Sequence, residues 1–268
     1  MKKIAVCGKG GVGKTTVTSL LAYCLAEQGR EVYAIDADVN PTLAEALGFP
    51  PELVAEIRPI ADMTALVEER TKAKIGEYGS YFKTNPTVKD LPEKLSRKIK
   101  NINFLMMGAM RTAEQGCACA ENAMLKALVT HLILKEKETV ILDMVAGTEH
   151  MGRGTAKGVD LMVLVVEPGS RSVKAARDID RMAGEMGVKR RVLIGNKIRS
   201  PEDEEFLKRE LGEGAFAGFL PAHDDVVSAE RRGLALYEYS PPMRELIRAM
   251  WGAVCAGREA AACTAQIF

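Results

Sequence analysis

Residues 8–16 carry the clearest chemistry in the chain. They read Gly-Lys-Gly-Gly-Val-Gly-Lys-Thr-Thr, which satisfies G-x-x-x-x-G-K-[ST] directly after a short apolar run and directly before a helical pattern. Glycines let successive backbone N–H groups turn toward phosphate oxygens, Lys14 can reach the β and γ oxygens, and Thr15 can place its hydroxyl on Mg²⁺. The segment therefore predicts a site for a nucleoside triphosphate. Its members are Gly8, Lys9, Gly10, Gly11, Val12, Gly13, Lys14, Thr15 and Thr16.

Three aspartates each follow an apolar run, and they are the candidate groups for magnesium and water. Asp36 and Asp38 lie one residue apart, and Asp143 comes later in the chain. Carboxylates just past strand ends can hold Mg²⁺ and the attacking water beside a γ-phosphate. The structural alternatives stay open, namely Asp36 and Asp38 capping a helix at residues 41–47 and Asp143 capping a turn.

The segment Asn196-Lys197-Ile198-Arg199 bears on the choice of base. Guanine-specific proteins use N-K-x-D, in which the aspartate accepts hydrogen bonds from the guanine base. Arg199 stands at that position and cannot accept them. Asn196 can still reach an adenine edge, with Lys197 beside it, so the segment favours ATP over GTP.

Length and composition bound the class of protein. The 268 residues are 47% hydrophobic, which suffices for the core of a single domain over residues 1–268. A net charge of +1, without a basic patch interleaved with aromatics, argues against nucleic-acid binding. No apolar run approaches the roughly 18–20 residues that span a bilayer, and a strand beginning at Lys3 leaves no room for a signal peptide. We therefore expect a cytoplasmic protein without membrane contact, whose six cysteines are reduced.

Apolar runs alternate with helical patterns, which predicts the elements that position these groups. Continuous β-rich runs suit an α/β fold, a doubly wound, mostly parallel sheet with helices on both faces. In such a fold the loops that follow the strands converge on one ligand site. Residues 49–101 interrupt the alternation, and we expect an insertion of short helices and loops there. The predicted strands are 4–7, 32–35, 102–107, 140–142, 161–166, 192–194 and 216–220, and the predicted helices are 14–28, 121–134, 172–186, 202–211 and 243–256.

Lys9, at the second position of the phosphate loop, links the sequence to a particular class. The loop resembles the deviant Walker A motif of the MinD/ParA/nitrogenase iron-protein P-loop ATPases. This resemblance implies a nucleotide-sandwich homodimer, in which Lys9 crosses to the partner's triphosphate and offsets charge that develops during phosphoryl transfer, while Lys14 serves its own subunit. It also implies that Asp38 orients or activates the attacking water.

The same resemblance extends to the magnesium and adenine contacts. Asp36 is assigned to the magnesium shell, and Asp143 resembles a Walker B acid bonded to a magnesium-bound water. The loop that packs on adenine in this class resembles the segment Pro221-Ala222-His223.

Cys117 and Cys119 precede the predicted helix 121–134, where the helix dipole favours thiolate. Two sulfurs are half of a four-coordinate site, and the twofold homodimer implied by Lys9 would supply the other two from the same patch of the partner. A tetrahedral site of four sulfurs suits Zn²⁺ and a square-planar one suits Ni²⁺. The alternative is a pair of thiols without a metal.

A closer resemblance covers most of the chain. Cys117 and Cys119 before a helix, together with residues 143–155, look like the CooC-type ATPases that insert nickel into carbon monoxide dehydrogenase. The resemblance implies a nickel chaperone that cycles between ATP and ADP and delivers its metal to that client. Val145 departs from the family pattern, where an acidic residue follows Asp-Met, and keeps open a sibling role in maturing acetyl-CoA synthase. His150 is either an auxiliary ligand or a hydrogen-bonded structural residue.

Two other classes stay open. An iron-protein relative would carry a [4Fe–4S] cluster between subunits, yet residues 143–155 lack the cysteine that nitrogenase-type proteins use there. A MinD/ParA-like spatial organiser would need a basic amphipathic tail or a DNA-binding surface. Residues 257–268 contain one arginine and one glutamate, which do not make such a tail.

Overall fold

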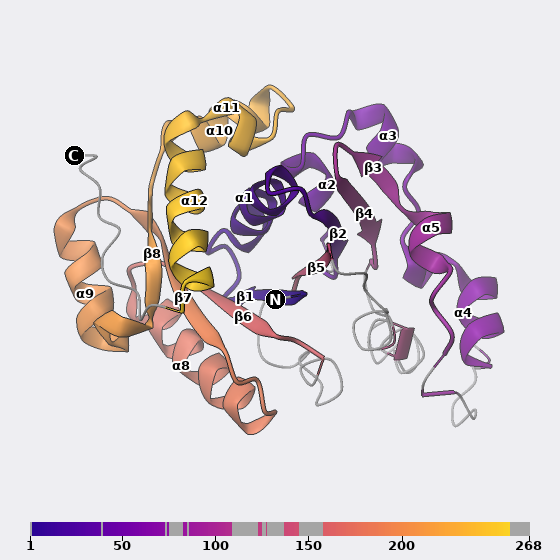
Figure 1. Cartoon of the computed structure of the whole chain (residues 1–268), viewed down its shortest axis with the longest axis horizontal. Coiled ribbons are helices and arrows are strands. Elements are labelled where there is room, and N and C mark those ends of the chain that lie inside the picture. The colour runs from indigo at the N-terminus through magenta and orange to yellow at the C-terminus, as the bar shows by residue number, and fades with distance from the viewer. Residues whose placement is uncertain are drawn as a thin grey trace.

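The computed structural model describes residues 2–38, 40–72, 74, 83–84, 86–108, 123–124, 127, 137–144 and 158–257. Its strands are β1 (Lys3–Gly8), β2 (Glu31–Asp36), β3 (Arg97–Ile99), β4 (Ile102–Met106), β5 (Glu138–Asp143), β6 (Leu161–Val166), β7 (Arg191–Ile198) and β8 (Phe216–Pro221). Within the described ranges these eight strands form one sheet in the order β3-β4-β2-β5-β1-β6-β7-β8 (Figure 1). Every neighbouring pair is parallel except β3 with β4. The predicted mostly parallel α/β sheet is confirmed.

Helices cover both faces of the sheet. The described helices are α1 (Lys14–Glu27), α2 (Leu43–Ala46), α3 (Pro51–Glu56), η1 (Ile60–Asp62), α4 (Thr64–Thr71), α5 (Leu91–Leu95), α8 (Ser170–Glu185), α9 (Pro201–Leu211), η3 (Glu213–Ala215), α10 (Asp224–Arg231), α11 (Leu236–Tyr239) and α12 (Pro241–Cys255). Apolar side chains of α1, α2, α11 and α12 form the core on one face, and those of α4, α5, α8 and α9 form it on the other. Figure 1 shows α1 and α12 packed beside one another.

The sequence of β1 explains why the sheet is buried on both faces. Successive side chains of a strand point to opposite sides. Ile4 and Val6 accordingly join the core beneath α1, while Ala5 and Cys7 join the core on the opposite face. All four side chains are at most 2% exposed. Because β1 is central and is buried from Ile4 to Gly8, the loop that follows it lies in the middle of the carboxyl edge of the sheet.

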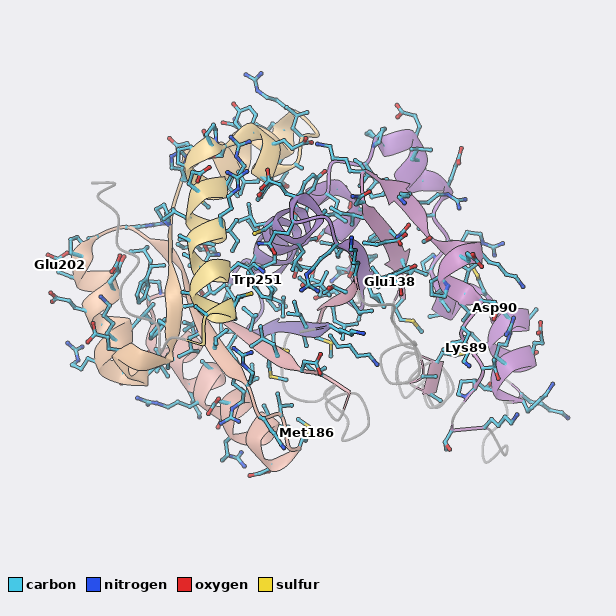
Figure 2. The ribbon with its side chains drawn as sticks, viewed as in Figure 1. Lys89, Asp90, Glu138, Met186, Glu202 and Trp251 are labelled. Carbon is cyan, nitrogen blue, oxygen red and sulfur yellow. The ribbon has the colours of Figure 1, made fainter. Side chains whose placement is uncertain are left out.

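The far end of α1 is fixed to α11 and α12. Trp251 on α12 is 2% exposed, and its Nε1 donates to the side-chain oxygen of Gln28, one residue past α1, at 3.3 Å (Figure 2). The hydroxyl of Tyr237 donates to Glu27 at 2.6 Å, and Arg248 donates to both of these side chains. The three helices are therefore joined by buried packing and by one hydrogen-bond network.

Between β2 and β4 the chain forms short helices joined by loops and also one strand. Arg70 on α4 donates two hydrogen bonds, of 2.9 and 2.7 Å, to Asp90 beside α5 (Figure 2). The prediction of helices and loops alone over 49–101 was incomplete, because Arg97–Ile99 forms β3, antiparallel to β4. The turn between them places Lys100 at a φ of 51°. β3 has three residues, of which two are charged and exposed, so the sequence contains no apolar run that would indicate this strand.

The other predicted elements that the structure describes agree with it to within a few residues, apart from three short helices that were not predicted. These are η3, which precedes β8, and α10 and α11, which follow it. Only residues 123, 124 and 127 of the predicted helix 121–134 are described, and all three are helical. Among the described residues, no helix combines the length and the apolar character needed to cross a membrane.

Candidate functional site

The phosphate loop connects β1 to α1, and at two of its positions a side chain larger than that of glycine would collide with neighbouring atoms. Gly13 has a φ of 91°, and a Cβ there would lie 2.2 Å from Nδ2 of Asn196. A Cβ on Gly8 would lie 2.5 Å from the carbonyl oxygen of Val165 on β6. The glycines thus permit both the turn and the close approach of neighbouring strands. The loop has the tight backbone that the sequence predicts.

Lys14, Thr15 and Asp143 come together at the start of α1. The hydroxyl of Thr15 donates to Oδ2 of Asp143 at 2.6 Å. Lys14 is buried, and its Nζ lies 3.5 Å from the carbonyl oxygen of Lys9. Burial, reinforced by the negative charge of Asp36, raises the pKa of Asp143 to about 7. A hydroxyl beside a buried carboxylate is the donor set that Mg²⁺ takes from proteins when phosphate oxygens and water complete its shell, so these residues fit the ion.

Thr18 is a fourth member of this cluster that the sequence reasoning missed. Its hydroxyl donates to the carbonyl oxygen of Lys14 at 2.9 Å and approaches Oδ1 of Asp143 at 3.3 Å. Thr18 is fully buried. Thr15 therefore donates to Oδ2 of Asp143, and the hydroxyl of Thr18 lies within reach of Oδ1, sharing its one proton between Asp143 and the carbonyl of Lys14. The two threonines are three apart on α1, a spacing that places them on one helix face and could have indicated the pair.

Asp36 is engaged with the backbone that follows β2. Its Oδ1 accepts from the N–H of Asp38 at 3.0 Å, and its Oδ2 accepts from the N–H of Leu43, the first residue of α2, at 2.9 Å. Burial is the main reason that the pKa of Asp36 rises to about 6. The structure thus shows the helix-capping arrangement that the sequence left open for Asp36. Asp38 is half-buried, and its Oδ1 accepts from the N–H of Asn40 at 3.0 Å.

The three aspartates still form one electrostatic cluster. Asp36 and Asp38 both act to raise the pKa of Asp143. Within the described ranges, however, no group of three histidine, cysteine or acidic side chains is arranged to hold a metal by itself. A cation at this position therefore depends on oxygens from another source, and the phosphates of a nucleotide would provide them.

The segments proposed for the base lie beside the phosphate loop. Asn196 Nδ2 donates to the carbonyl oxygen of Val12 at 2.7 Å, and Lys197 Nζ donates to that of Gly11 at 2.5 Å. The carboxylate of Glu167, one residue past β6, accepts from Lys197 at 3.1 Å. The polar atoms of Asn196 and Lys197 are thus directed at loop carbonyls.

The segment 221–223 follows β8 and runs beside the end of β7. Pro221 ends β8, and the N–H of Ala222 donates to the carbonyl oxygen of Ile198 at 2.8 Å. His223 caps α10 by accepting from the N–H of Asp225 at 3.2 Å. The structure therefore brings the two predicted adenine segments together at one edge of the loop.

A hollow of about 490 Å³ lies beside the start of α1. Thr15 and Thr16 form one wall, and apolar side chains that include Phe49, Val226 and Leu236 form much of the rest. Its size and mixed lining are those of a small-molecule site.

Several predicted site residues lie outside the described residues. These are the proposed thiol ligands Cys117 and Cys119 and, in the segment after Asp143, Val145 and His150.

Comparison with known proteins gives concordant matches. The family model described as the CobQ/CobB/MinD/ParA nucleotide binding domain matches residues 3–236. The chain is 42% identical over 252 residues to the carbon monoxide dehydrogenase accessory protein CooC of Rhodospirillum rubrum, which covers 94% of this chain and 95% of that protein. It is also 42% identical over 247 residues to an uncharacterized ATP-binding protein of Methanocaldococcus jannaschii, which covers 91% and 94% of the two chains.

Among solved structures, the fold is similar to that of the septum site-determining protein MinD of Pyrococcus horikoshii in complex with Mg-ADP. The TM-score is 0.67 at 19% identity, and the match covers 97% of this chain and 99% of that one. At that identity the likeness establishes the fold alone.

Proposed function

The chain belongs to the CobQ/CobB/MinD/ParA nucleotide-binding family and is a CooC-type ATPase, and on this premise we propose that it uses ATP to deliver nickel to a carbon monoxide dehydrogenase. The observation that carries the proposal is the 42% identity to the Rhodospirillum rubrum accessory protein across 94% of this chain. The cluster of Thr15 and Asp143 beside the phosphate loop supports it, because this cluster is suited to a magnesium nucleotide.

Hydrolysis at this site requires neutralised phosphate charge and an oriented water. Lys14 binds the β and γ oxygens, and Asp38 orients the water for attack. Mg²⁺, when bound, would supply positive charge that offsets the negative charge of the phosphates. The hydroxyl of Thr15 and the carboxylate of Asp143 would hold the ion. Lys9 reaches the triphosphate of the partner subunit in an ATP-bound homodimer, which couples dimer closure to hydrolysis.

Nickel is the cargo of this cycle. Cys117 and Cys119 from the two protomers together offer four sulfurs, and the ATP-bound dimer assembles them into one site. ATP and ADP favour different dimer arrangements, so hydrolysis changes the affinity of the site for Ni²⁺ and releases it to the client. Zn²⁺ competes for the same sulfurs because both metals accept thiolate ligands.

Equilibrium dialysis tests the proposed nickel site. With ATP present, the wild-type protein is expected to bind one Ni²⁺ per two chains, and a Cys117→Ser/Cys119→Ser variant is expected to bind none. Cys255→Ser is the matched control, because Cys255 is an exposed free cysteine. Zn²⁺ is titrated in parallel to compare the two metals. Equal nickel binding by wild type and the double variant would end the proposal.

Delivery is tested with the client. Nickel-free carbon monoxide dehydrogenase should gain activity from nickel-loaded wild type with ATP, and not from Lys14→Ala, which lacks the phosphate contact. Light scattering should show a dimer for wild type with ATP, and a weaker dimer for Lys9→Ala. Activation of the client to the same extent without ATP would contradict the coupling.

A further inference from the structure

Asn196 and Lys197, at the end of β7, hold the phosphate loop by its carbonyl oxygens. Asn196 Nδ2 donates to Val12 at 2.7 Å, and Lys197 Nζ donates to Gly11 at 2.5 Å. Asn196 is only 6% exposed, and a Cβ on Gly13 would collide with its amide. Two consecutive residues of β7 therefore contact two consecutive peptide groups of the loop.

Lys197 is held in place from two directions. Its backbone has a φ of 60°, in the left-handed region that non-glycine residues rarely adopt. Glu167 accepts from the same ammonium at 3.1 Å. The strained backbone directs the side chain toward the loop, and the carboxylate keeps its charge partly neutralised beside Gly11.

The geometry has a direct consequence for phosphate binding. A peptide group is planar, and its C=O and N–H point in opposite directions. A carbonyl of Gly11 that is fixed outward therefore fixes the N–H of Val12, and a fixed carbonyl of Val12 fixes the N–H of Gly13. These are the N–H groups that a phosphate loop turns toward its anion.

We propose that Asn196 and Lys197 are positioning residues for the phosphate loop, which prepare its N–H groups for the polyphosphate. The inference rests on the proposed binding of nucleotide at this loop. The contact with the loop acts on the polyphosphate and would therefore serve any nucleoside triphosphate equally.

The test compares ligands that share a polyphosphate and differ in the base. Dissociation constants for ATP, GTP and inorganic tripolyphosphate are measured by calorimetry on full-length wild type and on Lys197→Met. Loss of one charge-assisted hydrogen bond to the loop should weaken all three ligands by the same factor, about tenfold, and leave the ATP-to-GTP ratio unchanged. Lys174→Met, an exposed lysine on α8, is the matched control and should change nothing.

Two further variants separate positioning from folding. Lys197→Gly removes the ammonium but tolerates the positive φ, so the nucleotide-free protein should melt at the wild-type temperature or above and still bind all three ligands about tenfold more weakly. Glu167→Gln keeps an acceptor for Lys197 and should weaken binding by a smaller factor.

The outcomes distinguish the inference from the proposed function. A loss confined to ATP, with tripolyphosphate unaffected, would show that Lys197 reads the base and would overturn the inference alone. Wild-type affinity in both Lys197 variants would overturn it as well. A wild-type protein that binds none of the three ligands would instead overturn the proposed function on which the inference rests.

Discussion

At the scale of single residues, the site depends on how one buried carboxylate is held. Asp143 is 1% exposed, and a hydroxyl lies beside each of its oxygens: that of Thr15 at 2.6 Å, and that of Thr18, which also faces the carbonyl of Lys14, at 3.3 Å. If the hydroxyl of Thr15 served as a ligand of Mg²⁺, the contact with Thr18 would be the one left to hold Asp143. This gives Thr18 a role that the phosphate-loop motif does not include.

Thr18→Val removes that hydroxyl and keeps the shape of the side chain. We expect the apparent Mg²⁺ requirement of ATP hydrolysis to rise by about threefold to tenfold, the equivalent of one hydrogen bond of about 1 kcal/mol. Steady-state ATPase assays at varied Mg²⁺ check this. Thr18→Ser, which restores the hydroxyl, should return the requirement to that of wild type. A normal requirement in the valine variant would show that Thr15 alone suffices.

The buried aspartates also predict how stability depends on pH. Burial raises the pKa of Asp143 to about 7 and that of Asp36 to about 6, from the ordinary value of 3.8. Between pH values of about 4 and about 7, these two carboxyl groups bind more protons in the folded chain than in the unfolded chain. The nucleotide-free protein therefore loses stability as pH rises through that range. Glu27 and Asp90 act in the opposite direction, because hydrogen bonds from arginine lower their pKa values and the stability that they contribute is lost as pH falls below their ordinary values.

Asp143→Asn tests this sign, because asparagine keeps an acceptor for Thr15 and never ionises. At pH 8 the nucleotide-free variant should be more stable than wild type, and at pH 5 the difference should shrink. Urea denaturation without Mg²⁺ or nucleotide measures it. A variant that is less stable than wild type at pH 8 would mean that the lost carboxylate was stabilising, contrary to its burial.

At the scale of secondary-structure elements, α1 is held at both ends by different chemistry. It begins at Lys14 in the phosphate loop, and its last residue, Glu27, joins the network of Tyr237 and Arg248. Tyr23 on α1 and Tyr237 on α11 stack with ring centroids 5.6 Å apart. Ring stacking and hydrogen bonding thus both join α1 to Tyr237 of α11.

Tyr237→Phe removes the hydroxyl of this network and retains the ring that stacks on Tyr23. The unfolding free energy should fall by about 1 kcal/mol, because Glu27 loses the hydroxyl it accepts from and Arg248 loses a partner. Urea denaturation at neutral pH measures the change. Tyr239→Phe on the same helix keeps its ring against Arg232 and serves as the control, with a change expected within about 0.5 kcal/mol. Equal losses in both variants would assign the effect to the helix as a whole.

At the scale of the whole molecule, the cysteines divide by their surroundings. Cys7 lies in the central strand and Cys24 in α1, both buried, and burial raises their pKa values to about 12 and about 11. Cys255, near the end of α12, is exposed. Since the thiolate is the reactive form, only exposed thiols should react in the folded protein.

Maleimide labelling followed by peptide mapping turns this division into a test of the proposed assembly. Cys255 should be labelled under all conditions, and Cys7 and Cys24 only after denaturation. Cys117 and Cys119 should be labelled in the metal-free protein and protected by Ni²⁺ with ATP, because coordinated thiolates do not react. Protection of Cys255 under the same conditions would point to a general change of exposure instead of a shared metal site.

The sequence predicted the strands well because buried parallel strands are continuous apolar runs, as in 161–166, which matches β6 at both ends. It did not predict β3, whose residues are mostly charged and exposed, because pairing across a two-residue turn leaves no periodic signal. The loop, Thr15 and Asp143 were brought together as expected. The direction of Asn196 and Lys197 could not be predicted, because a motif gives the position of a side chain along the chain and not the partner that the fold places opposite it.

The packing of Trp251 has a practical consequence. It is the single tryptophan of the sequence, and its indole donates to Gln28 at the end of α1. Because α1 has 14 residues, this contact lies about 20 Å from the phosphate loop, at the other end of the same helix. A tilt of α1 on ligand binding would change the surroundings of the Trp251 indole. Tryptophan emission would therefore report such a movement of α1 without an added dye.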